Sequence, residues 1–243
     1  MYDRPETAAS LDRLWALIRD ALRARGVAAP ERLHRGPDLW ALWTAGDIVL
    51  AQTCGLPYRA RLHRHVALIG TPDHGVAGCP PGYYRSVLVV RAEDARSTLA
   101  AHAGARLAYN EALSQSGWAA PVAHADAQGV RLRPVGPTGS HAASVRAVVE
   151  GRADIAGIDA VSWALMRRHD AALTDRLRVL ATTAPTPGLP LIAAAGADRT
   201  AILAACRDAV ARLPGKDRDT LSLRGITDVH AGAYLALPLP PAP

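Results

Sequence analysis

Two short segments of the chain combine hydroxyl side chains with glycine just before a predicted helix. They are Ser114-Gln115-Ser116-Gly117 and Thr138-Gly139-Ser140-His141. The start of a helix has backbone N–H groups without intrahelical partners, and the helix dipole is positive there. Glycine lets an anion approach that backbone, and serine or threonine hydroxyls add donors. Two such starts that face one point would bind a small oxyanion without any lysine.

Each segment also has a simpler interpretation. Ser116 and Ser140 could serve only as N-caps, worth about 1 kcal/mol each. The pair favours anion binding because both segments follow predicted strands whose carboxyl ends should share one edge of a sheet. Ligands of open α/β sheets bind outside that edge. For either segment taken alone, both interpretations stay open.

Asp159 and His141 are further candidates for the same edge. Asp159 ends a predicted strand, and a carboxylate there would repel an anion unless a proton lies between them. It therefore favours a ligand that can donate, such as a protonated phosphate oxygen or an amine, although it could equally cap the helix that starts near Val161. His141 could donate to an anion, act as a general base, or simply lie on the surface of a first helical turn.

The remaining reactive or aromatic residues give weaker signals. Tyr83, Tyr84 and Tyr109 could line a cleft, but core packing is the commoner role of a tyrosine. Cys54 is best interpreted as a small buried thiol, and it could pair with Cys79 only in an oxidising compartment. Cysteine and histidine spacings match no metal pattern, and no cofactor fingerprint occurs, so we expect neither a metal nor a cofactor.

Composition limits the classes of protein that fit. The chain has 243 residues, enough for one large domain or two small lobes, and its 49% hydrophobic content predicts an ordered core. The net charge of +6 is scattered, so we expect no nucleic-acid partner, although small anions would be attracted. No apolar run reaches the roughly 18 residues that span a membrane, and no export signal is visible. As written, this is a cytosolic protein, or an exported one whose leader is missing.

Strands alternate with helices along most of the chain, which predicts α/β layers with a largely parallel sheet. The predicted strands are residues 48–51, 66–69, 86–91, 106–109, 130–135, 154–158, 177–182 and 191–194. The predicted helices are residues 11–22, 97–102, a short one from about 116, 141–150, 161–169 and 200–213. Loop-rich stretches at 71–84 and 183–190 resemble crossings between two lobes. The proline-rich tail, 237–243, is expected to be frayed.

Five segments, in order and at similar spacing, resemble the phosphate/phosphite/phosphonate substrate-binding proteins of ABC transporters. They are YRSVLVVR (84–91), SQSG (114–117), TGSH (138–141), GRADIAGID (151–159) and PGLP (187–190). The resemblance covers most of the chain. It implies the two-lobed type 2 periplasmic-binding-protein fold, with a ligand cleft between the lobes that closes about a hinge. Residues 1–84 and 184–243 would form a discontinuous first lobe, and residues 85–183 an inserted second lobe.

The resemblance also implies a site and partners. The oxyanion, of the phosphate, phosphite or phosphonate class, would meet both helix starts, Asp159 would accept a hydrogen bond, and Tyr84 with the Gln52-Thr53-Cys54 loop would line the opposite side. The residues that would bind it on the helix starts are Ser114, Ser116, Gly117, Thr138, Gly139, Ser140 and His141. A periplasmic location and an ABC permease partner are implied as well.

Two other functions stay open. A cytosolic enzyme on the same fold, similar to menaquinone-pathway enzymes, would act on a carboxylate substrate, and His141 would be its base. The missing leader favours this alternative, whereas the lack of a paired acid and base or an activated nucleophile opposes it. A ligand-sensing domain is the third possibility.

The resemblance generates one prediction about the start of the chain. The family fold usually opens with a strand, whereas Met1-Tyr2-Asp3 resembles the loop that follows it. Loss of a central strand would leave sheet edges unpaired and the lobe less stable. We therefore expect a protein extended upstream to melt at a higher temperature in thermal denaturation. Equal melting temperatures would contradict this expectation.

Overall fold

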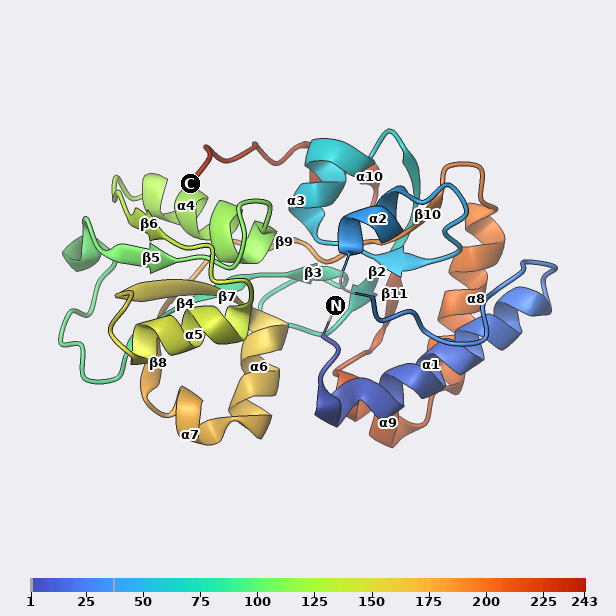
Figure 1. Cartoon of the computed structure of the whole chain (residues 1–243), viewed down its shortest axis with the longest axis horizontal. Helices are drawn as coiled ribbons and strands as arrows, with labels where there is room; N and C mark the ends of the chain where they lie inside the picture. Colours follow the sequence, from blue (N-terminus) through green and yellow to red (C-terminus); the bar gives the residue numbers. More distant parts are fainter. Residues whose placement is uncertain (1, 37) are drawn as a thin grey trace. The chain divides into compact units, whose positions relative to one another are not determined.

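The computed structural model describes residues 2–36 and 38–243 and divides the chain into two compact units (Figure 1). Unit 1 comprises Met1–Tyr83 and Pro187–Leu237, and unit 2 comprises Tyr84–Thr186 and Pro238–Pro243. Tyr84 and residues 184–186 and 238–243 therefore lie in unit 2, whereas the sequence placed them in the first lobe. The backbone passes between the units at 83/84, 186/187 and 237/238. Short strands β3 (Tyr83–Tyr84) and β9 (Thr186–Pro187) pair where the first two passages occur.

Unit 1 contains an antiparallel sheet whose strands do not follow one another in sequence order. Its strands, in spatial order, are β1 (Ala51–Gln52), β10 (Leu191–Ala194), β2 (Val66–Asp73) and β11 (Gly225–Thr227). Every neighbouring pair is antiparallel. The expectation of a largely parallel sheet is wrong for this unit, because β10 enters after unit 2, lies between β1 and β2, and runs opposite to both.

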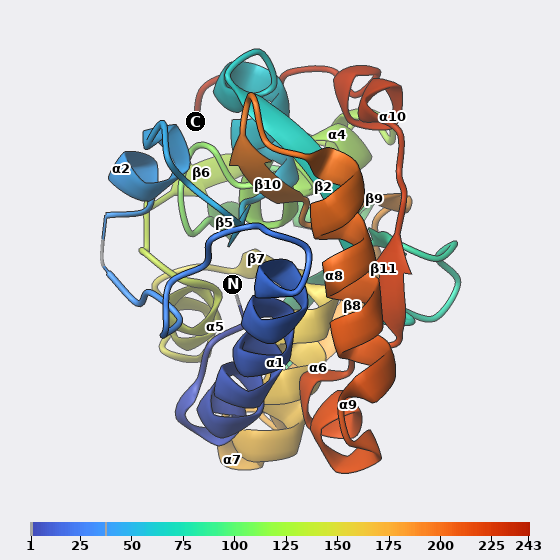
Figure 2. The same cartoon turned by 90° about the vertical axis from the view of Figure 1, so that its right-hand side faces the viewer.

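Two long helices cover this sheet and build its core. They are α1 (Pro5–Arg23) and α8 (Arg199–Arg212), which pack together in Figure 2. Trp15 and Leu22 of α1 meet Ile202 and Cys206 of α8 over Ile69 of β2. The amphipathic spacing of α1 explains this, since its apolar face recurs every three to four residues. Five shorter helices complete the unit: α2 (Leu39–Thr44), α3 (Gly55–Pro57), the π-helix η1 (Tyr58–Leu62), α9 (Gly215–Leu221) and α10 (Ala231–Leu235).

One edge of the unit 1 sheet borders an apolar pocket. Strand β1 pairs with β10 on one side only. A pocket of about 620 Å³ lies beside it, lined among others by Tyr2, Trp15, Leu50 and Leu191. The additional strand suggested by the family resemblance stays a prediction.

Unit 2 is built on a five-stranded mixed sheet. Its strands, in spatial order, are β6 (Arg133–Val135), β5 (Arg106–Ala108), β7 (Ile155–Asp159), β4 (Ser86–Arg91) and β8 (Leu177–Thr182). Strands β6, β5 and β7 are parallel, whereas β4 is antiparallel to both of its neighbours. The predicted parallel arrangement therefore holds for three adjacent strands, and these are the strands that lead into the candidate site.

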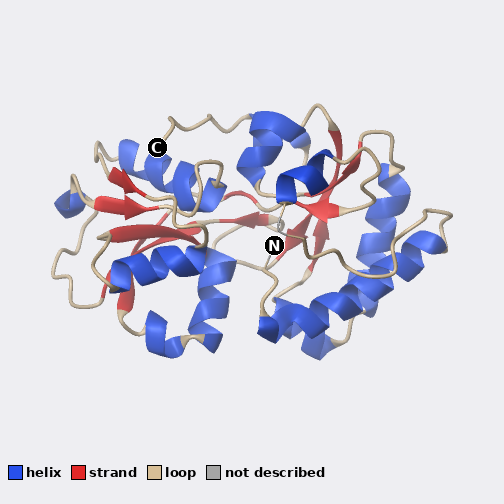
Figure 3. Cartoon of the chain, in the orientation of Figure 1, coloured by secondary structure: helices blue, strands red, loops and turns tan. Residues whose placement is uncertain are grey.

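Helices cover both faces of this sheet (Figure 3). The π-helix η3 (Gln115–Ala119) and α4 (Ala120–Asp126) cover the face that carries Leu88, Leu107 and Ile155. The opposite face carries Val89 and Ala156 and packs against the remaining helices. These are α5 (His141–Val149), α6 (Ala160–His169) and α7 (Ala171–Thr174). The helix predicted at 97–102 is only a 3₁₀ turn, η2 (Ala100–His102).

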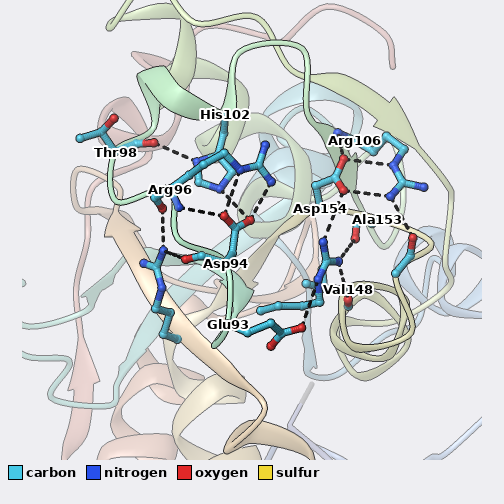
Figure 4. A network of polar contacts seen from close by, with 12 residues as sticks. Glu93, Asp94, Arg96, Thr98, His102, Arg106, Val148, Ala153 and Asp154 are labelled. Carbon is cyan, nitrogen blue, oxygen red and sulfur yellow. Dashed lines mark hydrogen bonds and ion pairs between the residues drawn. The ribbon is translucent and has the colours of Figure 1, made fainter.

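An ion-pair network holds the end of this sheet that lies away from Asp159 (Figure 4). Arg106 binds Asp154 through Nε and Nη2 at 3.0 and 2.9 Å, and its backbone N–H donates to the same carboxylate. The Arg106 guanidinium lowers the pKa of the Asp154 carboxyl to about 2. A second cluster pairs Asp94 with Arg96 and with the buried His102. Strands β5 and β7 are thereby fixed in register at their amino ends.

The proline-rich tail is not frayed. Residues 238–243 pack as part of unit 2, and the Pro241 carbonyl accepts a hydrogen bond from Trp118 Nε1 at 2.8 Å. The expectation was wrong because it rested on local composition, whereas this contact joins residues far apart in sequence. No helix in the described part of the chain is long and apolar enough to cross a membrane.

Candidate functional site

Three adjacent parallel strands bring the predicted segments to one edge of the unit 2 sheet. Strand β5 leads through Tyr109 and Asn110 into η3, β6 leads through residues 136–140 into α5, and β7 ends at Asp159. The strands run in the order β6-β5-β7 and point the same way. Their carboxyl ends therefore share one edge, where open α/β sheets bind ligands.

The two helix starts are in direct contact. Ser116 Oγ lies 2.9 Å from His141 Nε2. The preceding loops are also joined, since Gly139 N donates to Asn110 O at 2.9 Å and Thr138 N donates to Tyr109 O at 2.9 Å. The hydroxyl-bearing segments that the sequence singled out therefore converge at one place.

The start of η3 differs in detail from the simple capping interpretation. Ser114, rather than Ser116, is the N-cap, and its Oγ accepts from Gly117 N at 2.9 Å. Ala119 N donates to Ser114 O at 3.0 Å, which closes a wide π-helical turn, a rare form that often occurs at functional sites. A side chain at Gly117 would collide with Asn110 Oδ1. A larger residue at position 117 would therefore displace the Asn110 side chain. Ser116 contacts His141 from this turn.

Helix α5 begins with a regular N-cap, and hydrogen bonds of Thr138 stabilise the loop before it. Ser140 is its N-cap, and its Oγ accepts from Ala143 N at 3.1 Å. Thr138 Oγ1 lies 2.7 Å from Ser144 Oγ and 3.2 Å from the Tyr109 carbonyl oxygen. Gly139 has a φ of +87°, a left-handed conformation that favours glycine. The Thr138 hydroxyl thus holds the loop, and the Ser140 hydroxyl keeps its hydrogen to donate.

Asp159 lies on the same side of the sheet as η3. Side chains alternate along a strand, so Gly157 and Asp159 share a face of β7. A Cβ on Gly157 would lie 3.0 Å from Ser116 O, which shows that this face meets η3. Ser86, paired opposite Asp159, donates from Oγ to the same Ser116 carbonyl at 2.9 Å. The Asp159 carboxylate caps α6 by accepting from Ser162 N at 2.8 Å, the alternative role that the sequence left open.

His141 is neutral at physiological pH. Its Nδ1 is closed off from solvent, and the imidazole has a backbone contact with Gly157. Burial lowers the pKa of the imidazole to about 4. A neutral imidazole has one donor and one acceptor nitrogen, and the Ser116 hydroxyl can either donate to Nε2 or accept from it. His141 therefore contributes hydrogen-bonding capacity and no positive charge.

The other predicted residues are spread between the units. Tyr84 is buried in unit 2, and Tyr109 packs against Trp118 with ring centroids 5.2 Å apart. The Gln52-Thr53-Cys54 loop and Tyr83 belong to unit 1, so their role opposite the anion stays a prediction. All three cysteines, Cys54 and Cys79 among them, are free thiols. Within the described ranges, no group of histidine, cysteine and carboxylate side chains could hold a metal.

Sequence analysis missed Asn110 and Ser86. Asn110 follows β5 directly, the same position that singled out Asp159 after β7, and its buried Oδ1 has no hydrogen-bond partner within the described chain. Ser86 opens β4, and nothing local to its sequence indicates its contact with Ser116. Asn110 could have been predicted because it follows a strand, as Asp159 does, whereas Ser86 could not.

Comparison with known proteins agrees with this geometry. Residues 38–231 match the model of a family described as the phosphonate periplasmic substrate-binding proteins of ABC transporters. A comparison with curated proteins gave no match. Because the family model covers most of the chain, it establishes the family.

Several solved structures share the fold. XAC2383 from Xanthomonas citri, bound to chloride, has a TM-score of 0.69 at 17% identity, with 96% of this chain and 92% of that chain covered. PhnD1 from Prochlorococcus marinus, in complex with methylphosphonate, also has a TM-score of 0.69 at 17% identity, with 93% and 90% covered. A binding protein of an ABC phosphonate transporter from Pseudomonas aeruginosa has a TM-score of 0.65 at 16% identity, with 94% and 79% covered.

These likenesses support the expected type 2 periplasmic-binding-protein fold. The five sequence segments, the three-strand edge and the family match all lead to the same assignment. This chain belongs to the phosphonate-binding family of periplasmic substrate-binding proteins of ABC transporters.

Proposed function

We propose that the β6-β5-β7 edge of unit 2 binds a small oxyanion of the phosphate, phosphite or phosphonate class, and that the protein delivers it to an ABC permease. The observation that carries the proposal is the contact between the two helix starts through Ser116 and His141. A structural relative, PhnD1, is in complex with methylphosphonate. The periplasmic location expected from the family is part of this proposal.

Hydroxyl and amide groups supply the donors. Ser114 Oγ and Ser140 Oγ each accept from a backbone N–H, so the hydrogen of each hydroxyl is left to donate to a ligand. Helix α5 adds the positive end of its dipole at the same point. An anion can be held in this way by fixed dipoles without a charged partner.

The acceptors at the edge restrict the ligand further. Asp159 ends β7 at this edge, and Asn110, which follows β5, has a buried Oδ1. His141 is uncharged there. A fully ionised ligand would be repelled by the carboxylate, whereas one that carries a proton can donate to it. We therefore expect a monoprotonated oxyanion to bind better than a fully ionised one.

The side opposite the helix starts is proposed to come from the Gln52-Thr53-Cys54 loop of unit 1, whereas Tyr84 belongs to the same unit as the helix starts. The passages at 83/84 and 186/187 would then act as the hinge. No catalysis is required by this proposal.

Ser116 and His141 are also residue types that can serve as a catalytic nucleophile and its general base. A histidine with a pKa of about 4 is a poor base near neutral pH. Binding is therefore favoured over catalysis at this site.

A thermal-shift panel tests the ligand class. Phosphate, phosphite and alkylphosphonates should raise the melting temperature, whereas sulfonates and aromatic carboxylates should not. Binding at a hundredfold excess over the dissociation constant stabilises a protein by about 2.7 kcal/mol. Stabilisation by carboxylates alone, accompanied by turnover, would favour the enzyme on the same fold instead.

Substitution of the two hydroxyls tests the site. Ser116→Ala and Ser140→Ala should each weaken binding by about 1.5–3 kcal/mol, the range for hydrogen bonds to a charged group. Isothermal titration with the best anion of the panel measures the change. Ser97→Ala, at an exposed position of the same unit, is the matched control. Unchanged affinity in both variants would show that other loops bind the ligand.

The pH dependence of stability tests the environment of His141. The folded pKa is about 4, below the roughly 6.5 of an unfolded histidine, so the unfolded chain takes up the proton first as the pH falls. Stability from neutral His141 is complete above about pH 6.5 and is lost down to about pH 4. Urea denaturation at pH 7.5 and 5.0 should show a smaller decrease for His141→Gln than for the wild type. Buried His74, whose pKa is also lowered, contributes equally to both proteins. Identical decreases would mean that His141 is not held in the neutral form.

A further inference from the structure

The tail, defined as residues 238–243, connects a fixed point of unit 1 to unit 2. It follows helix α10, which belongs to unit 1. Tyr234 of α10 is fully buried, and its hydroxyl lies 2.6 Å from Thr71 Oγ1 and donates to Gly188 O at 3.0 Å. The tail itself packs with unit 2. Both of its ends are therefore anchored, each in a different unit.

Its anchor in unit 2 is a buried indole. Trp118 Nε1 donates to the Pro241 carbonyl at 2.8 Å, and the Trp118 residue is only 4% exposed. A buried indole N–H that lacks an acceptor is costly, so this contact fixes the ring as well as the tail. Tyr109, which precedes Asn110, packs against the same ring.

Trp118 belongs to the π-helical turn of the candidate site. It directly follows Ser116 and Gly117, and its backbone N–H shares the Ser114 carbonyl acceptor with that of Ala119, at 3.3 and 3.0 Å. A shift of the indole would therefore move the backbone that presents the Ser116 hydroxyl and the Gly117 position.

The composition of the tail suits this contact. Its sequence, PLPPAP, contains four prolines, which limit backbone freedom and reduce the entropy lost on ordering. Leu239 is 62% exposed, so apolar burial of that side chain does not hold the segment. The carbonyl of Pro241 is one point of attachment of the tail to unit 2.

We propose that the tail is a positioning element of the oxyanion site: Pro241 fixes Trp118, and Trp118 fixes the Ser116–Gly117 turn. This inference rests on the proposed function. It assigns to the last residues of the chain an effect on ligand affinity, although they do not touch the ligand.

Two truncations that differ by two residues test the proposal. A chain ending at Pro240 lacks the Pro241 carbonyl, and a chain ending at Ala242 keeps it as a neutral amide carbonyl. Titration with phosphate, phosphite and methylphosphonate should show about fivefold weaker binding for the first, the loss expected for one neutral hydrogen bond, and near wild-type binding for the second. The indole N–H resonance of Trp118 should shift only in the first.

Trp118→Phe in the full-length chain gives an independent measurement. It removes the donor and keeps an aromatic ring, so it should lower the affinity by a similar factor. Combined with the truncation at Pro240, it should cause no additional loss, since both changes break one contact. The truncation pair leaves the core intact and decides the question even if the phenylalanine variant folds poorly.

The outcomes separate the two proposals. If the full-length chain binds one of the three anions and both truncated chains bind it equally well, the role of the tail is overturned and the proposed function stands. Additive losses in the combined variant would also overturn it. If the full-length chain binds none of these anions, the proposed function fails and this inference fails with it.

Discussion

The hydrogen bond between Ser116 Oγ and His141 Nε2 joins helices that cover opposite faces of the unit 2 sheet. Such a bond can form only beyond the ends of the strands, because elsewhere the sheet separates the two layers. It therefore depends on strands β5 and β6 being adjacent, parallel and of matching length. The same constraint brings Asp159 to this edge, since β7 pairs with β5 on its other side. The ion pairs of Arg106 at the amino ends preserve that alignment.

Burial determines the electrostatics of the site. Removal of the imidazole from water disfavours its charged form, so His141 acts as a neutral hydrogen-bonding group. The positive potential at the site must then come from the backbone dipoles at the helix starts, which do not change with pH. A site of this kind keeps its donors over a wide pH range, and the protonation state that varies is that of the ligand.

Local sequence patterns predicted the strands well where apolar runs are continuous. Residues 86–91, 177–182 and 191–194 were predicted with the bounds that the structure shows. Helices α9 and α10 and strand β11 were missed because they span seven residues or fewer and carry little periodicity. The direction of β10 was wrong because strand pairing is non-local.

The candidate site shows the same division. Hydroxyls, glycines and Asp159 were predicted because each follows a predicted strand, and the carboxyl ends of those strands share one edge of the unit 2 sheet. The sequence suggested Ser116 as an N-cap, whereas the structure shows Ser114 in that role. This difference was not predictable, since a π-helical turn has no local sequence signature. The contact of Trp118 with Pro241 joins positions more than a hundred residues apart, so no local pattern could reveal it.

The single-sided pairing of β1 has a consequence for how this protein behaves in the test tube. Backbone groups on an open strand edge beside an apolar pocket form a template onto which another extended chain can add. Association of the purified protein at high concentration would then begin at this edge of unit 1, by addition of a strand from a second molecule. Gln52 is the half-buried position of β1 where a charged side chain would oppose such pairing, whereas Ala51 and Ile48 are buried in the core.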